Sequence, residues 1–172
     1  MFEKRPTWRR DALPSLVLVL FLSGFSSAPP ASDIDPDIAE AVFRYQFAHN
    51  ASGQKAEANV YCIGFSSRSA DGGINRDPST EFLTRFADVK PPVKAASQCS
   101  FDKKFGNSVV DRSTGGFGLI FRIESVKCAD NSHCDVQGGY YEANESSSGN
   151  TYHLEKQREK WVVVGDNMNW IS

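Results

Sequence analysis

The stretch that decides the fold is residues 117–124, Phe-Gly-Leu-Ile-Phe-Arg-Ile-Glu. Large apolar side chains occupy every second position from Phe117 to Ile123, and glycine or charged residues stand among the positions between them. A period of two residues is typical of an antiparallel strand with one buried face. Three later segments, 134–142, 151–156 and 161–165, are separated by polar turn signals. From Gly115 onward, the sequence therefore predicts a meander of three or four antiparallel strands.

Two helices are expected before this meander because an Asp-Pro pair opens each of them. Asp35 can cap a helix, Pro36 suits its first position, and apolar residues at helical spacing continue to about His49. Asp77-Pro78 repeats the device, and Pro91-Pro92 ends the second helix.

One stripe of the first helix is expected to face the core. Its residues are Ile38, Ala41, Val42, Tyr45, Ala48 and His49. Phe43 and Phe47 would lie on the far side of this helix and make a second apolar contact. Between the helices, residues 60–65 predict a buried strand. Helices first and strands last define the α+β class: a twisted antiparallel sheet with two helices packed on one face, forming a single domain over 35–172.

The N-terminal residues have the layout of a secretory signal. Four basic residues within 1–12 precede an uninterrupted apolar core, Leu16–Leu22, which is much shorter than the roughly 20 residues that span a bilayer. Small residues place cleavage after Ala28 or near Ala31. We therefore expect a signal peptide over 1–28, a short linker over 29–34, and a secreted or periplasmic protein with no transmembrane span in its mature form. The alternative is an N-terminal anchor that is not cleaved.

Four cysteines, Cys62, Cys99, Cys128 and Cys134, follow the signal segment. An even number of cysteines in an exported chain indicates disulfides, and three pairings are possible. The short, turn-like segment between Cys128 and Cys134 favours a bond between these two, which would leave Cys62 to pair with Cys99.

Composition and motifs argue against several function classes. The chain has 19 Lys and Arg residues against 21 Asp and Glu residues, so it lacks the basic surplus that nucleic acid binding rewards, and no nucleic acid partner is expected. The sequence contains no GxSxG, phosphate-binding glycine loop or CxxC pair. We expect no cofactor and no metal.

Four residues are the only candidates for a pocket: Tyr45 and His49 from the first helix, and Tyr140 or Tyr141 from the sheet. His49 could transfer protons in such a pocket, or it could simply place a cation at the negative end of the helix. The glycine clusters at 115–118 and 138–139 are interpreted as places where the sheet bends or bulges.

A loosely basic middle region could attract an anionic surface or form an ordinary solvated loop face. Its residues are Lys90, Lys94, Lys103, Lys104 and Arg112.

Five short segments resemble a family of uncharacterised exported bacterial proteins. They are Phe43–Phe47, Asp77–Leu83, Thr151–Lys156, Trp161–Val164 and Asn167–Ser172. This resemblance implies export but neither an activity nor a site. The order of elements is also similar to the cone-shaped, nuclear-transport-factor-like α+β fold, which includes both pocket enzymes and plain binding domains.

The sequence favours a non-enzymatic exported domain that binds a protein or an envelope component, because no acid, base and electrophile are positioned together. The alternative is a cofactor-independent pocket enzyme of the cone-shaped fold, performing proton transfer or hydrolysis. It would require Tyr45, His49 and Tyr140 or Tyr141 to converge in one cavity.

Overall fold

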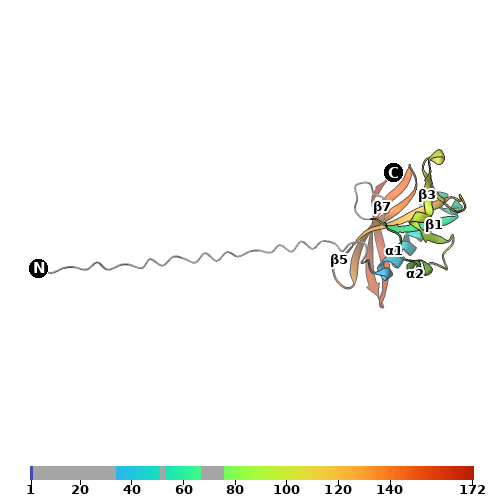
Figure 1. The fold of residues 1–172 in the computed structure, drawn as a ribbon. Helices are drawn as coiled ribbons and strands as arrows, with labels where there is room; N and C mark the ends of the chain where they lie inside the picture. Colours follow the sequence, from blue (N-terminus) through green and yellow to red (C-terminus); the bar gives the residue numbers. More distant parts are fainter. Residues whose placement is uncertain (2–33, 51–52, 67–75) are drawn as a thin grey trace.

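The computed structural model describes residues 34–50, 53–66 and 76–172, together with Met1. The expected signal segment, apart from Met1, and most of the linker therefore lie outside the described residues. Helix α1 (Pro36–His49) begins and ends as predicted (Figure 1). Oδ1 of Asp35 accepts a hydrogen bond from the backbone N–H of Asp37 at 2.8 Å, which satisfies one of the free donors of the first turn.

The face that α1 buries differs from the predicted stripe. The buried residues are Ile38, Ala39, Val42, Phe43, Gln46 and Phe47, whereas Ala48 and His49 are exposed. The rings of Phe43 and Phe47 supply the large apolar surface, and Phe47 packs against Tyr61 and Phe121 at centroid distances of 5.1 and 5.2 Å. The predicted stripe was therefore wrong in two respects. It included Ala48 and His49, which are exposed, and it placed Phe43 and Phe47 away from the core.

The main sheet has six strands in the order β2-β1-β5-β6-β7-β8. Their bounds are β1 (Val60–Phe65), β2 (Val93–Ala95), β5 (Gly118–Cys128), β6 (His133–Ala143), β7 (Ser146–Gln157) and β8 (Lys160–Ile171). Strands β5 to β8 form the predicted antiparallel meander, while β1 pairs in parallel with both β2 and β5. A central parallel strand is covered on both faces, which explains why β1 is buried throughout. The α+β class is confirmed, with a mixed sheet.

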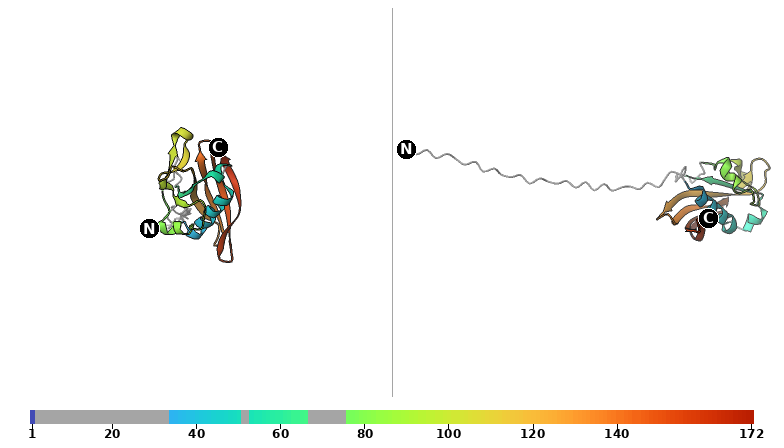
Figure 2. Two further views of the ribbon diagram at one scale, coloured as in Figure 1. Left: turned by 90° about the vertical axis from the view of Figure 1, so that its right-hand side faces the viewer. Right: turned by 90° about the horizontal axis from the view of Figure 1, so that it is seen from below.

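The second helix, α2 (Thr80–Thr84), is shorter than predicted and begins later. Oγ of Ser79 caps it by accepting a hydrogen bond from the N–H of Phe82 at 3.1 Å. Asp77, the predicted cap, instead accepts a hydrogen bond from the N–H of Ser97 at 3.0 Å. Both helices lie on the same side of the sheet, where Phe82 and Phe86 join Phe43 in the core (Figure 2).

Strand β7 is also longer than its sequence suggests. Residues 146–149 have turn composition, yet they pair with β6 from Ala143↔Ser146 to Gly139↔Gly149. The turn itself is formed by Asn144 and Glu145. Long-range pairing overrides the weak local preference of this serine-rich segment.

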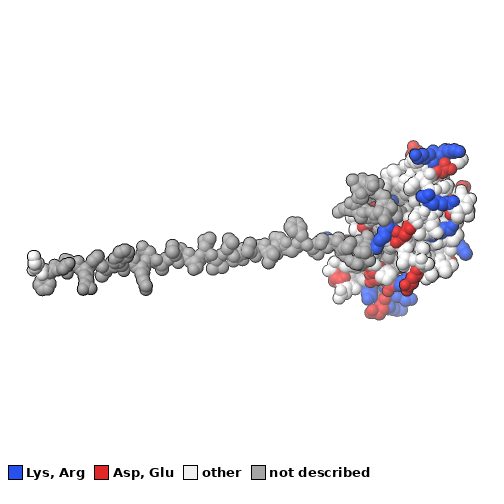
Figure 3. Space-filling model, in the orientation of Figure 1, with Lys and Arg blue, Asp and Glu red and all other residues white. Residues whose placement is uncertain are grey.

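The far side of the sheet carries a second, smaller core. A hairpin of β3 (Cys99–Asp102) and β4 (Ser108–Asp111) packs there, and Val109 and Ile120 lie beside the disulfide between Cys62 and Cys99. Lysine and arginine side chains are interspersed with acidic ones over the visible surface, and basic side chains lie at the tip of this hairpin (Figure 3).

Two disulfides join Cys62 to Cys99 and Cys128 to Cys134, the pairing that the sequence favours. Cys128 and Cys134 face each other across β5 and β6, close to the connection between these strands. The described part of the chain contains no helix that is long and apolar enough to cross a bilayer. The two disulfides fit an oxidising compartment.

Candidate functional site

The four residues that the sequence nominated for a pocket do not converge. Tyr45 is half-buried on α1 and His49 is exposed at the end of that helix, with their ring centroids 4.3 Å apart. Tyr140 is buried in the core beneath α1. Tyr141 points to the opposite face of the sheet, where it packs against the smaller core, because successive strand residues alternate between the two faces.

Tyr45 serves to join α1 to the edge strand β8. Its hydroxyl donates a hydrogen bond to Oδ1 of Asp166 at 2.8 Å, and Nδ2 of Asn150 donates to Oδ2 of the same carboxylate at 2.6 Å. Burial, and then the bond to Asp166, raise the pKa of Tyr45. The phenol therefore stays protonated at neutral pH and acts as a hydrogen-bond donor.

A second polar contact, which the sequence gave no reason to expect, lies deeper under α1. Nε2 of Gln46 donates hydrogen bonds to the carbonyl of Arg122 and to the hydroxyl of Tyr152, both at 3.1 Å. Gln46 and Tyr152 are fully buried, and burial raises the pKa of Tyr152. This pair ties α1 to β5 and β7 through the amide nitrogen of Gln46, because a buried N–H group without a partner would be costly.

The opposite face of β5 to β8 carries a series of polar side chains, among them Asp135, Thr151, His153 and Asn167, and we call it the polar face. One row of directly opposite residues crosses all four strands: Arg122, Gly139, Gly149 and Trp170. The two glycines leave the middle of the row flat, so the long side chains at its ends can extend toward each other. The Arg122 guanidinium lies 5.6 Å from the centre of the Trp170 ring.

Packing explains why glycine is needed in this row. A Cβ atom at Gly149 would lie 2.2 Å from Nε1 of Trp170, and one at Gly139 would lie 1.9 Å from the carbonyl oxygen of Ser148. The indole therefore lies against the backbone of β7 while the side chain stays 47% exposed. The close approach of the Ser148 carbonyl agrees with the structural role expected for Gly139. The bulge in β5 lies between Ile123 and Ser125, and Ile123 pairs with Gly138.

The neighbouring rows of the polar face hold their side chains in fixed positions. Nδ1 of His153 lies 2.7 Å from Oδ1 of Asp135, and Nε2 of His153 lies 2.8 Å from Nδ2 of Asn167. The amide Nδ2 of Asn169 donates to Oγ1 of Thr151 at 3.0 Å. His153 thus joins Asp135 on β6 to Asn167 on β8, with one ring nitrogen at hydrogen-bond distance from each.

A shallow hollow of about 220 Å³ adjoins this network near the Cys128–Cys134 disulfide. Its walls include Lys127, His133, Asp135, His153 and Glu155. His133 also lies 3.0 Å from the carboxylate of Asp130, whose pKa is held at about 2 by hydrogen bonds from Ser132 and then by His133. The hollow is thus lined by both donors and acceptors.

Among the described residues, no group of three or more His, Cys, Asp and Glu side chains is placed to hold a metal ion. No family model, curated protein or solved structure matches the chain. The functional interpretation therefore depends on the geometry of the polar face.

Proposed function

We propose that the protein is an exported, non-enzymatic binding domain that takes a glycan on its polar face. The observation that carries this proposal is the row from Arg122 to Trp170, in which two glycines expose an indole ring beside fixed polar side chains. A sugar ring presents C–H groups on its faces and hydroxyl groups at its edges. An aromatic ring flanked by amide, hydroxyl and imidazole groups matches both features.

Preorganisation supports this proposal. His153, Asn167, Thr151 and Asn169 are already held by contacts with one another or with Asp135, so a ligand would not have to order them. Carboxylate oxygens of Asp135 and the hydroxyl of Thr151 keep further lone pairs for sugar hydroxyl groups.

Export is part of the same proposal. The basic and apolar pattern of residues 1–28 is that of a signal peptide, and the two disulfides suit an oxidising compartment. A glycan-binding domain in that compartment would meet the polysaccharides of the cell envelope. The described core is built wholly from residues 34–172, so residues 29–172 are the unit to study.

The test is calorimetric titration of residues 29–172 with three ligands: oligosaccharides of N-acetylglucosamine, oligosaccharides of glucose, and peptidoglycan fragments. We expect millimolar to micromolar binding of at least one of the three, and a loss of at least tenfold in affinity on Trp170→Ala. Val162→Ala is the matched control, because Val162 is exposed on the same face of β8 but outside the row. Absence of binding to all three ligands, or equal affinity of the Trp170→Ala protein, would contradict the proposal.

A further inference from the structure

The hairpin of β3 and β4 is the second distinctive surface of the molecule. A short 3-10 helix, Lys103–Phe105, connects its strands, and the hairpin projects from the rest of the domain (Figures 1 and 2). We define the hairpin tip as residues 101–107. Phe105 is 72% exposed and Phe101 55% exposed, which places two aromatic rings in solvent on one small protrusion.

Basic side chains accompany these rings. Lys103 and Lys104 are both exposed, and neither forms an ion pair with a described residue. The one carboxylate of the tip, Asp102, accepts a hydrogen bond from the backbone N–H of Lys104 at 2.9 Å and so closes the turn. In Figure 3 the basic side chains mark the end of the hairpin.

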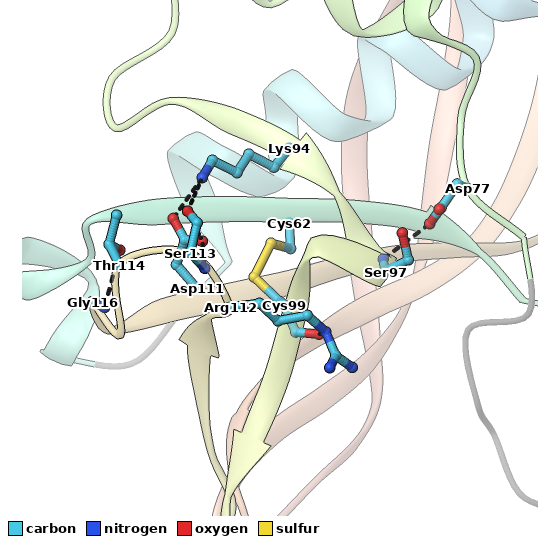
Figure 4. Close-up of a disulfide and its surroundings, with 10 residues drawn as sticks. All are labelled: Cys62, Asp77, Lys94, Ser97, Cys99, Asp111, Arg112, Ser113, Thr114 and Gly116. Carbon is cyan, nitrogen blue, oxygen red and sulfur yellow. Dashed lines mark hydrogen bonds and ion pairs between the residues drawn. A yellow bond between two sulfur atoms is a disulfide. The ribbon is translucent and has the colours of Figure 1, made fainter.

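Lys94 and Arg112, from the same basic middle region, have structural roles instead. Nζ of Lys94 contacts Oδ2 of Asp111 at 2.6 Å, and Nε of Arg112 donates to the carbonyl of Cys99 at 2.8 Å. Figure 4 shows both side chains around the disulfide that holds the base of the hairpin to β1. Within the basic middle region, Lys103 and Lys104 are therefore the two residues that lie at the hairpin tip.

The tip is held rigidly from below. The N–H of Asn144 donates to the carbonyl of Gly106 at 3.0 Å, and Nδ2 of Asn107 donates to Oδ1 of Asn144 at 2.8 Å. The ring of Tyr141 meets that of Phe101 edge-on at 5.4 Å. Gly106 and Asn107, with φ of 62° and 55°, take the left-handed conformation that reverses the chain. Exposure of Phe105 is thus built into the hairpin.

We propose that the hairpin tip attaches the domain to an anionic lipid membrane. Phe105, with Phe101 beside it, enters the boundary between headgroups and acyl chains, while Lys103 and Lys104 contact lipid phosphates. Aromatic side chains favour this interfacial region, and lysines near an anionic leaflet add attraction that salt screens. One short tip gives weak, reversible attachment, and this attachment is independent of glycan binding at the polar face.

Co-sedimentation with vesicles tests the proposal, using residues 29–172 so that the apolar signal segment is absent. We expect binding to vesicles of phosphatidylglycerol and phosphatidylethanolamine, at least fivefold less binding to phosphatidylcholine vesicles, and release in 1 M NaCl. The Lys103→Glu/Lys104→Glu protein and the Phe105→Ala protein should each bind the anionic vesicles at least fivefold less well than the unaltered domain.

The control is Lys90→Glu/Lys160→Glu, which changes the net charge by the same amount at two other exposed lysines. It should retain binding within twofold. An equal loss of vesicle binding in this control would show that net charge alone causes the effect, and it would contradict the assignment to the tip. Equal binding to phosphatidylcholine vesicles, or no binding to anionic vesicles, would also contradict the proposal. Unchanged thermal unfolding of the tip variants shows that a loss of binding is not a loss of folding.

Discussion

Asp111 is the residue on which the base of the hairpin depends. Its Oδ2 contacts Nζ of Lys94 at 2.6 Å, and its Oδ1 accepts hydrogen bonds from the N–H and Oγ of Ser113 at 2.9 and 2.8 Å. Lys94, and then Ser113, hold the pKa of Asp111 well below its usual range. The carboxylate is thus charged in the folded protein at pH values where an unfolded chain would already be protonated.

We therefore predict that Asp111→Asn lowers the free energy of unfolding at neutral pH and weakens its dependence on pH under acid conditions. A depressed pKa in the folded state contributes stability above the unfolded pKa of about 3.9, and that stability is lost as the pH falls below this value. Urea unfolding between pH 2 and 7 measures the effect. An equally steep loss of stability below pH 4 in the variant would show that other carboxylates are responsible.

Gly139 is predicted to resist substitution, whereas Gly165 should tolerate it. A Cβ at Gly139 would collide with the carbonyl oxygen of Ser148, while nothing lies within 4 Å of a Cβ built at Gly165. Gly139→Ala should lower the free energy of unfolding by about 1–3 kcal/mol or more. Gly165→Ala should change the free energy of unfolding by no more than about 0.5 kcal/mol. Denaturant titration compares the two, and similar costs would contradict the close strand approach at Gly139.

Residue-level features were predictable from the sequence where they are local. The Asp35 cap needs only its own turn, so the Asp-Pro pair was sufficient evidence for it. The row from Arg122 to Trp170 depends on the register of four strands, including the bulge between Gly149 and Asn150. A single sequence contains no signal that sets Trp170 opposite Gly149.

At the scale of elements, the two disulfides should contribute unequally to stability. Cys62 and Cys99 are 37 residues apart and Cys128 and Cys134 are 6 apart, and closing a longer loop restricts the unfolded chain more. Replacing both members of a pair by alanine should cost about 4 kcal/mol for the first bond and about 2 kcal/mol for the second. Urea unfolding of the two double variants measures this difference, and the reverse order would contradict it.

The prediction of the elements succeeded where periodicity was strong and failed where composition misled. Residues 60–65 and the strand beginning near Gly118 were found because apolar patterns cover all of β1 and the first half of β5. The start of β7 was missed because serine and glycine at 146–149 mimic a turn. The buried face of α1 was misplaced because a polar residue, Gln46, lies at its centre, where its Nε2 donates a hydrogen bond to the hydroxyl of Tyr152 on β7.

At the scale of the whole molecule, helices and hairpin occupy opposite sides of one mixed sheet. The helix side is filled by an aromatic core and leaves the predicted pocket residues apart. The far side is covered by the hairpin over β1 and β5, and the meander beyond it carries the polar face. The α+β class could be predicted from the order of helix and strand patterns along the chain. The positions of the hairpin and of the polar face on the far side could not, because they depend on which strands pair in the folded sheet.

The whole chain is also the scale at which export is tested. Residues 4–10 supply the basic segment and Leu16–Leu22 the apolar core of the expected signal, and small residues at 26–28 follow. We predict a mature protein that begins between residues 28 and 34 and is found outside the cytoplasm. Intact-mass measurement of the protein from fractionated cells decides this. A full-length species that begins at Met1, or a processed species confined to the cytoplasm, would contradict the predicted export. Export is also what the two disulfides lead us to expect, because disulfides persist in an oxidising compartment.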